Sequence, residues 1–121
     1  MIGIGTDLVE IPRFRQVIGR TPGIVERVFH EEERAYVAAL ADPTQSLAVR
    51  FAAKEAVMKA LGVGIGGVAM RDIEVVRADS GEPSLRLHGS AAALAAERGV
   101  ARWLLTLTHT DGLAQAIAVA L

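Results

Sequence analysis

The sequence predicts an α+β fold in a single domain over residues 1–121, with a small, mostly antiparallel sheet packed with one long central helix and shorter helices. Three observations support this prediction. An alternating strand pattern opens the chain, a helix with start and stop signals occupies its middle, and four more strand-like segments separated by turns fill most of its second half. The chain shows no internal repeat, linker or low-complexity tract, so nothing divides it further.

The first strand is expected over residues 2–9, where larger side chains alternate with Gly3, Gly5, Asp7 and Val9. One face of this strand is nearly free of side chains near Asp7, so another group can approach it closely. Two helices are expected next, from Pro12 to about residue 18 and over residues 31–40, with their Arg and Glu residues facing water.

The central helix is expected to start with Asp42 as the cap, Pro43 at the first helical position and Gln45 three residues after the cap. It should end at Leu61, because Gly62 can adopt the left-handed conformation that terminates helices. The second half predicts strands over residues 72–77, 84–88, 102–110 and 113–121, turns at 80–83 and 110–112, and an Ala-rich helix over 90–98.

Composition excludes several classes of function. The net charge is −1, so no general positive field is available to hold nucleic acid, and no apolar segment is long enough to span a membrane. The absence of cysteine excludes disulfide frameworks and thiolate zinc sites, and it fits a cytoplasmic protein. Only 4% of the residues are aromatic, so close backbone packing must supply cohesion and association between subunits would help the core.

Both lysines of the chain, Lys54 and Lys59, lie in the central helix, whereas the other eleven basic residues are arginine. Helical geometry puts Glu55 and Lys59 on one stripe with Ala48 and Ala52, with apolar residues beside it. This pattern predicts a partly buried cleft in which a lysine meets a phosphoryl oxygen. The alternative is an ordinary Glu–Lys pair four residues apart on a solvated helix face.

Asp7 is the other candidate, because a carboxylate in the middle of an apolar and Gly-rich strand needs a cation. Asp7 and Glu55 together would suit Mg²⁺ beside a phosphate. Alternatively, Asp7 caps a local turn or pairs with an arginine.

His109 lies at the end of an apolar strand, where it can contact a phosphate or serve as a hydrogen-bonded structural residue. The run Gly62-Val-Gly64-Ile-Gly-Gly67 matches a dinucleotide-binding pattern but follows a helix instead of a strand, so we reject that interpretation. The glycine run can still line a ligand. His30 and His88 have no converging partner in the sequence and receive no role.

Four segments together resemble the holo-[acyl-carrier-protein] synthase family of compact 4′-phosphopantetheinyl transferases. They are residues 3–11 (GIGTDLVEI), 50–62 (RFAAKEAVMKALG), 72–75 (DIEV) and 107–110 (LTHT). Their order matches that of the family, and the Lys-Glu-Ala-x-x-x-Lys core is the most specific part. Thr106 stands where the family often has Ser, and residues 18–42 cannot be matched one by one.

The resemblance implies the 4′-phosphopantetheinyl transferase fold and transfer of 4′-phosphopantetheine from coenzyme A to a serine of apo acyl carrier protein, in support of fatty acid biosynthesis. It implies catalytic roles for Asp7, Glu55 and Lys59, with Asp7 and Glu55 holding Mg²⁺. Glu55 or a metal-bound water would accept the serine proton. For Lys54, the other lysine of the helix, we expect a role in structure or assembly.

The resemblance also implies a homotrimer with the coenzyme A cleft between subunits. Coenzyme A would be bound by Lys59 and by the following residues: Arg50, Gly62, Gly64, His109 and Thr110. An acidic carrier would dock on Arg13, Arg15 and Arg20, which otherwise form a solvated helix face. Two other functions stay open: a non-catalytic module that binds coenzyme A or nucleotide, and a purely structural trimer.

Overall fold

The computed structural model describes all of residues 1–121. The chain folds into five helices, one 3-10 turn and five strands, in the order β1 (Gly3–Glu10), α1 (Ile11–Arg20), α2 (Ile24–Val28), α3 (Glu31–Ala38), α4 (Thr44–Leu61), η1 (Met70–Asp72), β2 (Ile73–Arg77), β3 (Pro83–Leu87), α5 (Gly89–Glu97), β4 (Trp103–His109) and β5 (Leu113–Ala120). None of the helices is long and apolar enough to cross a lipid bilayer.

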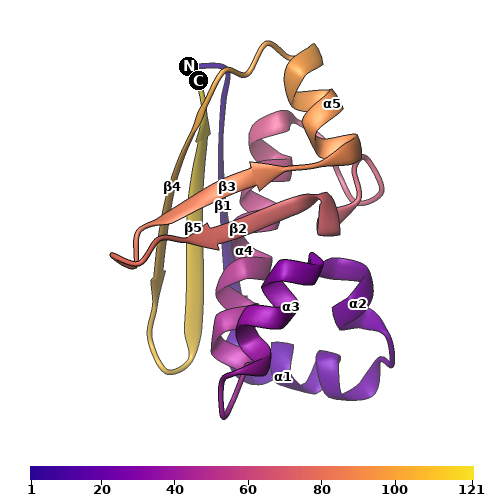
Figure 1. The fold of residues 1–121 in the computed structure, drawn as a ribbon, viewed down its shortest axis with the longest axis vertical. Helices are drawn as coiled ribbons and strands as arrows, with labels where there is room; N and C mark the ends of the chain where they lie inside the picture. The colour runs from indigo at the N-terminus through magenta and orange to yellow at the C-terminus, as the bar shows by residue number, and fades with distance from the viewer.

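The strands form two antiparallel sheets, a three-stranded sheet in the order β1-β5-β4 and the hairpin β2-β3. Helix α4 runs along the three-stranded sheet, α1, α2 and α3 gather around one end of α4, and α5 lies toward the other end (Figure 1). The predicted α+β class with a long central helix is therefore confirmed, with the strands divided between two sheets.

The elements differ from the prediction in a few places. Helix α4 begins at Thr44, one residue later than expected, although the Asp42 side chain still accepts a hydrogen bond from the Thr44 amide at 3.0 Å. Gly62 ends the helix in the left-handed conformation, with φ of 73°, as predicted. The short helices α2 and η1 were not predicted, because five and three residues are too few to show a helical pattern.

Strand β1 lies directly on the backbone of α4. A methyl group built on Gly3 would fall 1.9 Å from the Ala60 carbonyl oxygen, and one on Gly5 would fall 1.9 Å from the Ala56 carbonyl oxygen. The strand face that the sequence showed to be free of side chains is thus occupied by the main chain of α4. This contact fixes how Asp7 lies relative to the side chains of the helix.

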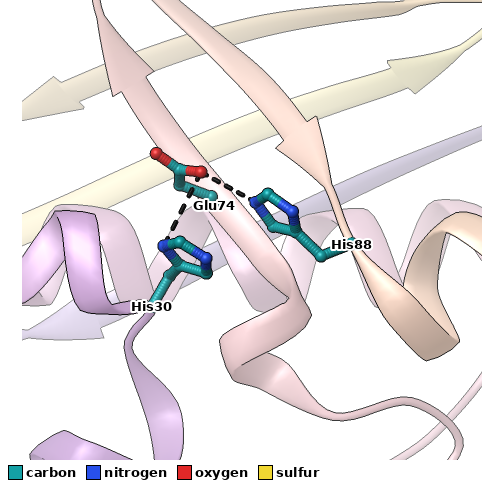
Figure 2. Close-up of side chains that lie close together, drawn as sticks. All are labelled: His30, Glu74 and His88. Carbon is teal, nitrogen blue, oxygen red and sulfur yellow. Dashed lines mark hydrogen bonds and ion pairs between the residues drawn. The ribbon is translucent and has the colours of Figure 1, made fainter.

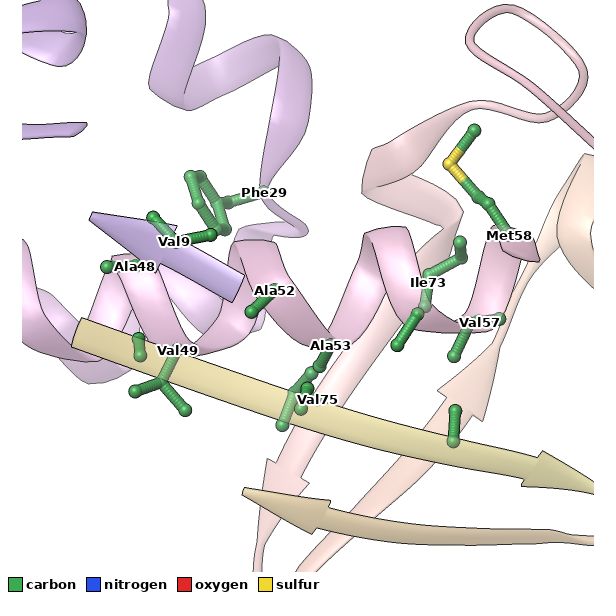
Figure 3. Close-up of a cluster of buried hydrophobic side chains, with 14 of the residues drawn as sticks. Val9, Phe29, Ala48, Val49, Ala52, Ala53, Val57, Met58, Ile73 and Val75 are labelled. Carbon is green, nitrogen blue, oxygen red and sulfur yellow. The ribbon is translucent and has the colours of Figure 1, made fainter. Parts of the chain in front are cut away.

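The core is built mainly from small side chains around α4. Figure 3 shows Ala48, Ala52 and Ala53 of α4 among Val9 of β1, Phe29 and the β2 residues Ile73 and Val75. The four alanines of β5, at positions 114, 116, 118 and 120, have no exposed surface. Close backbone packing therefore replaces the large aromatic rings that the chain lacks.

The opposite face of the three-stranded sheet is apolar and exposed. Its rows run across the strands as Ile4–Val119–Leu104 and Thr6–Ile117–Thr106. Ile4, Leu8 and Leu104 are each more than half exposed, at 59%, 59% and 52%. No element of the chain covers this face, which is unusual for a monomer of this size.

We predict that Gly5→Ala destabilises the protein by at least about 1–3 kcal/mol, because the new methyl group meets backbone that cannot rotate away. Gly19→Ala is the matched control. Gly19 is exposed in α1 with open space around it, so this change should stabilise the helix by about 0.5 kcal/mol. Urea unfolding of the three proteins gives the comparison, and equal stability of Gly5→Ala and wild type would contradict the close contact.

Candidate active site

Asp7, Glu55 and Lys59 come together where β1 crosses α4. Asp7 projects from the odd-numbered face of β1 toward the helix, and Glu55 and Lys59 lie one turn apart on α4. The Lys59 ammonium donates to the Thr6 carbonyl oxygen at 2.8 Å and lies 3.3 Å from Oδ1 of Asp7. The cation that the sequence required for Asp7 is therefore Lys59 within the chain itself, and no arginine pairs with Asp7.

Glu55 has a different environment. Its half-buried carboxylate has no hydrogen-bond or ion-pair partner in the chain. Burial raises the pKa of Glu55, the nearby Asp7 charge raises it further, and Lys59 opposes both effects. Two neighbouring carboxylates with one exposed lysine leave unbalanced negative charge, which a divalent cation would balance.

An apolar cavity of about 340 Å³ adjoins both carboxylates. Asp7, Glu10, Glu55 and Arg13 supply charged groups at its wall, and most of its remaining surface comes from apolar side chains of β1, α1, α2 and α4. The site thus combines a charged rim, suited to phosphate and metal, with an apolar chamber, suited to an uncharged chain.

Comparisons with known proteins identify the family. Residues 3–118 match the family model described as the 4′-phosphopantetheinyl transferase superfamily. The chain belongs to this superfamily. It is 50% identical over 117 residues to a holo-[acyl-carrier-protein] synthase of Clavibacter michiganensis subsp. michiganensis, covering 97% of this chain and 92% of the relative.

Solved structures of phosphopantetheinyl transferases agree with the fold. The holo-[acyl-carrier-protein] synthase of Neisseria meningitidis superposes with a TM-score of 0.91 at 31% identity, over 100% of this chain and 98% of that one. The Helicobacter pylori enzyme in complex with coenzyme A gives a TM-score of 0.83 at 28% identity, over 98% and 99% of the two chains.

The other residues that the sequence proposed for coenzyme A lie in two places. Gly62 lies at the wall of a hollow of about 240 Å³ that Lys59 also lines, and Gly64 is exposed in the loop that follows. His109 and Thr110 lie at the end of β4, with β5 between them and β1. The Thr110 hydroxyl accepts hydrogen bonds from the amides of Gly112 and Leu113. Within one chain, His109 and Thr110 are therefore not beside Asp7.

Arg50 lies on the other side of α4, away from the Asp7–Glu55–Lys59 group. It is buried, its Nε lies 3.7 Å from Oε2 of Glu33, and its guanidinium stacks on Tyr36 at 4.5 Å from the ring centroid. Burial lowers the pKa of Arg50, and the Glu33 charge opposes this effect. Its predicted contact with coenzyme A stays a prediction.

The three arginines of α1 do not share one face. Arg15 binds Asp42 at 2.9 Å and the Thr44 hydroxyl at 3.1 Å, so it joins α1 to the start of α4. Arg13 and Arg20 are seven residues apart on another face, where both line a surface hollow together with Thr110.

Two clusters of polar side chains were not predicted from the sequence. The first is buried: Lys54 donates to Glu33 at 2.5 Å, and both side chains are fully buried. The expectation that Glu residues of α3 face water is wrong for Glu33, which also forms a capping box with His30. His30-Glu-Glu-Glu33 has the three-residue spacing of such a box, so this signal was available, although His is a rare cap residue.

The second cluster joins His30, Glu74 and His88 (Figure 2). The sequence showed no converging partner for either histidine, whereas in the structure both lie beside Glu74. The three residues come from separate segments, so no local spacing reveals them.

Proposed function

We propose that this protein is a holo-[acyl-carrier-protein] synthase, which transfers 4′-phosphopantetheine from coenzyme A to a serine of apo acyl carrier protein and releases adenosine 3′,5′-bisphosphate. The observation that carries the proposal is the Asp7–Glu55–Lys59 group on a family-matched scaffold. The similarity to enzymes named holo-[acyl-carrier-protein] synthase, one of them solved with coenzyme A, supports the substrate.

Asp7 and Glu55 are suited to hold Mg²⁺, because the Glu55 carboxylate has no partner in the chain and the nearby Asp7 charge disfavours its ionised form. A bound cation would relieve this repulsion. When bound, Mg²⁺ would neutralise charge on the pyrophosphate of coenzyme A. Lys59 is exposed enough to contact a phosphoryl oxygen while it keeps its bond to β1. The serine oxygen forms a new P–O bond to the phosphate that carries pantetheine, and the bond to the departing adenosine bisphosphate breaks.

The serine must lose its proton as it attacks. Glu55, which has no partner in the chain, or a water held by Mg²⁺ would accept this proton. The apolar cavity beside Glu55 is suited to the pantetheine arm, whose middle is uncharged.

We further propose that the active unit is a homotrimer built on the exposed apolar face of the three-stranded sheet. A trimer would cover Ile4, Leu8 and Leu104 and would let His109 and Thr110 of one subunit approach the Asp7 of another. Burying this face would also compensate for the small side chains of the core.

Ile117→Arg tests the trimer, because Ile117 lies in the central row of that face between Thr6 and Thr106. We expect sedimentation to show monomers and the transfer rate to fall at least tenfold, since a buried unpaired charge opposes association. Glu97→Arg on the exposed side of α5 is the control and should stay trimeric. A trimeric Ile117→Arg would place the interface elsewhere.

Mass analysis of an apo carrier protein, incubated with the enzyme, coenzyme A and Mg²⁺, tests the reaction itself. The expected result is one added 4′-phosphopantetheine group on the carrier serine, with no addition when the metal is chelated. Binding of coenzyme A without any transfer would instead support a non-catalytic module.

Lys59→Arg should transfer more slowly than wild type, because a planar guanidinium replaces a compact ammonium poorly.

The carrier is expected to dock on Arg13 and Arg20, because acyl carrier proteins are acidic and these arginines have no ion-pair partner in the chain. Arg13→Glu with Arg20→Glu should raise the KM for carrier about tenfold and flatten its salt dependence, while the KM for coenzyme A changes little. Arg15→Glu is the matched control, because Arg15 is engaged with Asp42. Equal effects of both variants would move the docking surface elsewhere. We also propose a cytoplasmic location, which the absence of cysteine fits.

A further inference from the structure

Two histidines and a buried glutamate converge on the side of the molecule formed by α3 and the β2-β3 hairpin (Figure 2). Nε2 of His88 lies 2.8 Å from Oε1 of Glu74, and Nδ1 of His30 lies 3.7 Å from the same oxygen. One nitrogen from each histidine and one oxygen from Glu74 lie within 4.8 Å of one another. The imidazole rings are stacked, with centroids 4.3 Å apart and an angle of 11° between their planes.

Glu74 is a buried carboxylate whose nearest partner is a histidine. Its side chain is only 5% exposed, and the one Lys or Arg within ion-pair distance is Arg86, at 3.9 Å and 62% exposed. The buried Arg50 and Lys54 also attract Glu74, but both are paired with Glu33. An exposed guanidinium at this distance is screened by water and balances the buried carboxylate weakly. Both histidines can instead be neutral ligands, so a metal ion would supply the missing positive charge.

The buried Lys54–Glu33 pair holds the cluster in place. Glu33 accepts hydrogen bonds from the amides of His30, at 3.0 Å, and Val75, at 3.2 Å. Lys54 donates to the carbonyl oxygen of Ile73, so the main chain is held on both sides of Glu74. The amide of His88 donates to the Asp72 carbonyl oxygen at 2.8 Å. A rigid frame of this kind keeps ligand side chains near a binding geometry.

We propose that His30, Glu74 and His88 bind a divalent transition-metal ion of the Zn²⁺ class. Two imidazoles and one carboxylate are a known Zn²⁺ ligand set, whereas Mg²⁺ and Ca²⁺ prefer oxygen ligands alone. The ion would replace the proton that His88 and Glu74 share across their hydrogen bond. A hollow of about 260 Å³ adjoins both histidines and leaves room for a water as the fourth ligand.

His30 must give up one hydrogen bond to take part. Its Nδ1 now accepts from the Glu32 amide at 3.1 Å, as the cap of α3. Binding through Nδ1 exchanges this bond for a metal bond, and the second half of the capping box, from the His30 amide to Glu33, stays in place. This site is independent of the phosphopantetheinyl transfer and lies apart from Asp7 and Glu55.

Calorimetric titration of the metal-free, full-length protein with Zn²⁺ tests the proposal. We expect one equivalent to bind, and His88→Asn and His30→Asn each to weaken binding at least tenfold. Asn at position 30 is chosen because it is a preferred helix cap, so α3 should persist. Zn²⁺ should also raise the unfolding temperature of the wild type, because only the folded chain brings the three ligands together.

Two controls separate this site from the rest of the protein. His109→Asn removes the only other histidine, and Asp7→Asn with Glu55→Gln removes the candidate Mg²⁺ ligands; both proteins should bind Zn²⁺ within about twofold of wild type. Unchanged affinity in His88→Asn, or loss of affinity in either control, would overturn the proposal and leave a hydrogen-bonded structural pair. If His88→Asn fails to fold, the site can be tested in the wild type by adding Co²⁺ and recording the NMR resonances of the histidines. Paramagnetic shifts at His30 and His88 and not at His109 support the site, and shifts at His109 alone exclude it.

Discussion

Asp7→Asn or Glu55→Gln is expected to lower the rate of phosphopantetheine transfer at least about 100-fold, because each removes a charged oxygen needed at the pyrophosphate. The mass shift of an apo carrier, followed over time at saturating coenzyme A, measures the rate. A chelator should reduce the wild-type rate in the same way. Wild-type turnover that persists after thorough removal of divalent metal would contradict the proposed role of the two carboxylates.

Stability provides the control for Glu55→Gln. In the folded protein the pKa of Glu55 lies above its ordinary value of 4.5, so the ionised side chain costs stability at neutral pH. The neutral glutamine should therefore make the metal-free protein slightly more stable at pH 7. This advantage should disappear below about pH 4.5, where Glu55 is protonated in both the folded and unfolded states. Lost transfer in a protein of equal or higher stability separates chemistry from folding.

Lys54→Met is expected to lower the free energy of unfolding by about 3–5 kcal/mol, because it leaves the buried carboxylate of Glu33 without its main cation. The change also removes the donor to the Met70 and Ile73 carbonyl oxygens. Burial lowers the pKa of Lys54, and the Glu33 charge opposes this effect. Urea unfolding followed by circular dichroism gives the loss directly.

The double variant Lys54→Met with Glu33→Gln shows whether charge is the cause. It removes both charges of the pair, so it should recover part of the stability that Lys54→Met loses. Lys59→Met is a matched control on the same helix, because Lys59 is 53% exposed and water can reach its pair with Asp7; we expect a clearly smaller loss than for Lys54→Met. Equal losses at Lys54 and Lys59 would mean that the buried pair does not stabilise the fold.

The sequence predicted the parts of the fold that local patterns encode. Strand β1, helix α4 and the Gly62 stop follow from alternation, cap residues and glycine, and all three are present. The separation into two sheets was not predicted, because strand pairing depends on contacts between distant segments. Helix α2 is too short to leave a pattern.

In the candidate site, too, local patterns identified residues, but contacts between distant segments could not be predicted. Asp7, Glu55 and Lys59 were singled out because a charge in an apolar pattern needs a partner, and the structure brings Asp7 and Lys59 to 3.3 Å. Glu33 shows where this reasoning fails. It lies in an acidic run that looks like a solvated helix start, and only its partner Lys54, 21 residues away, explains its burial.

The backbone contact between β1 and α4 also determines how the site can move. Side-chain packing lets two elements shift as rotamers change, but Gly3 and Gly5 press main chain against main chain and leave nothing that can rotate. Strand and helix therefore cannot separate locally, and the β1 amides that are hydrogen-bonded to β5 should exchange with deuterium only as fast as the whole molecule unfolds. Substrates must accordingly enter and leave without any separation of β1 from α4, and the main chain that carries Asp7 and Glu55 keeps one spacing throughout.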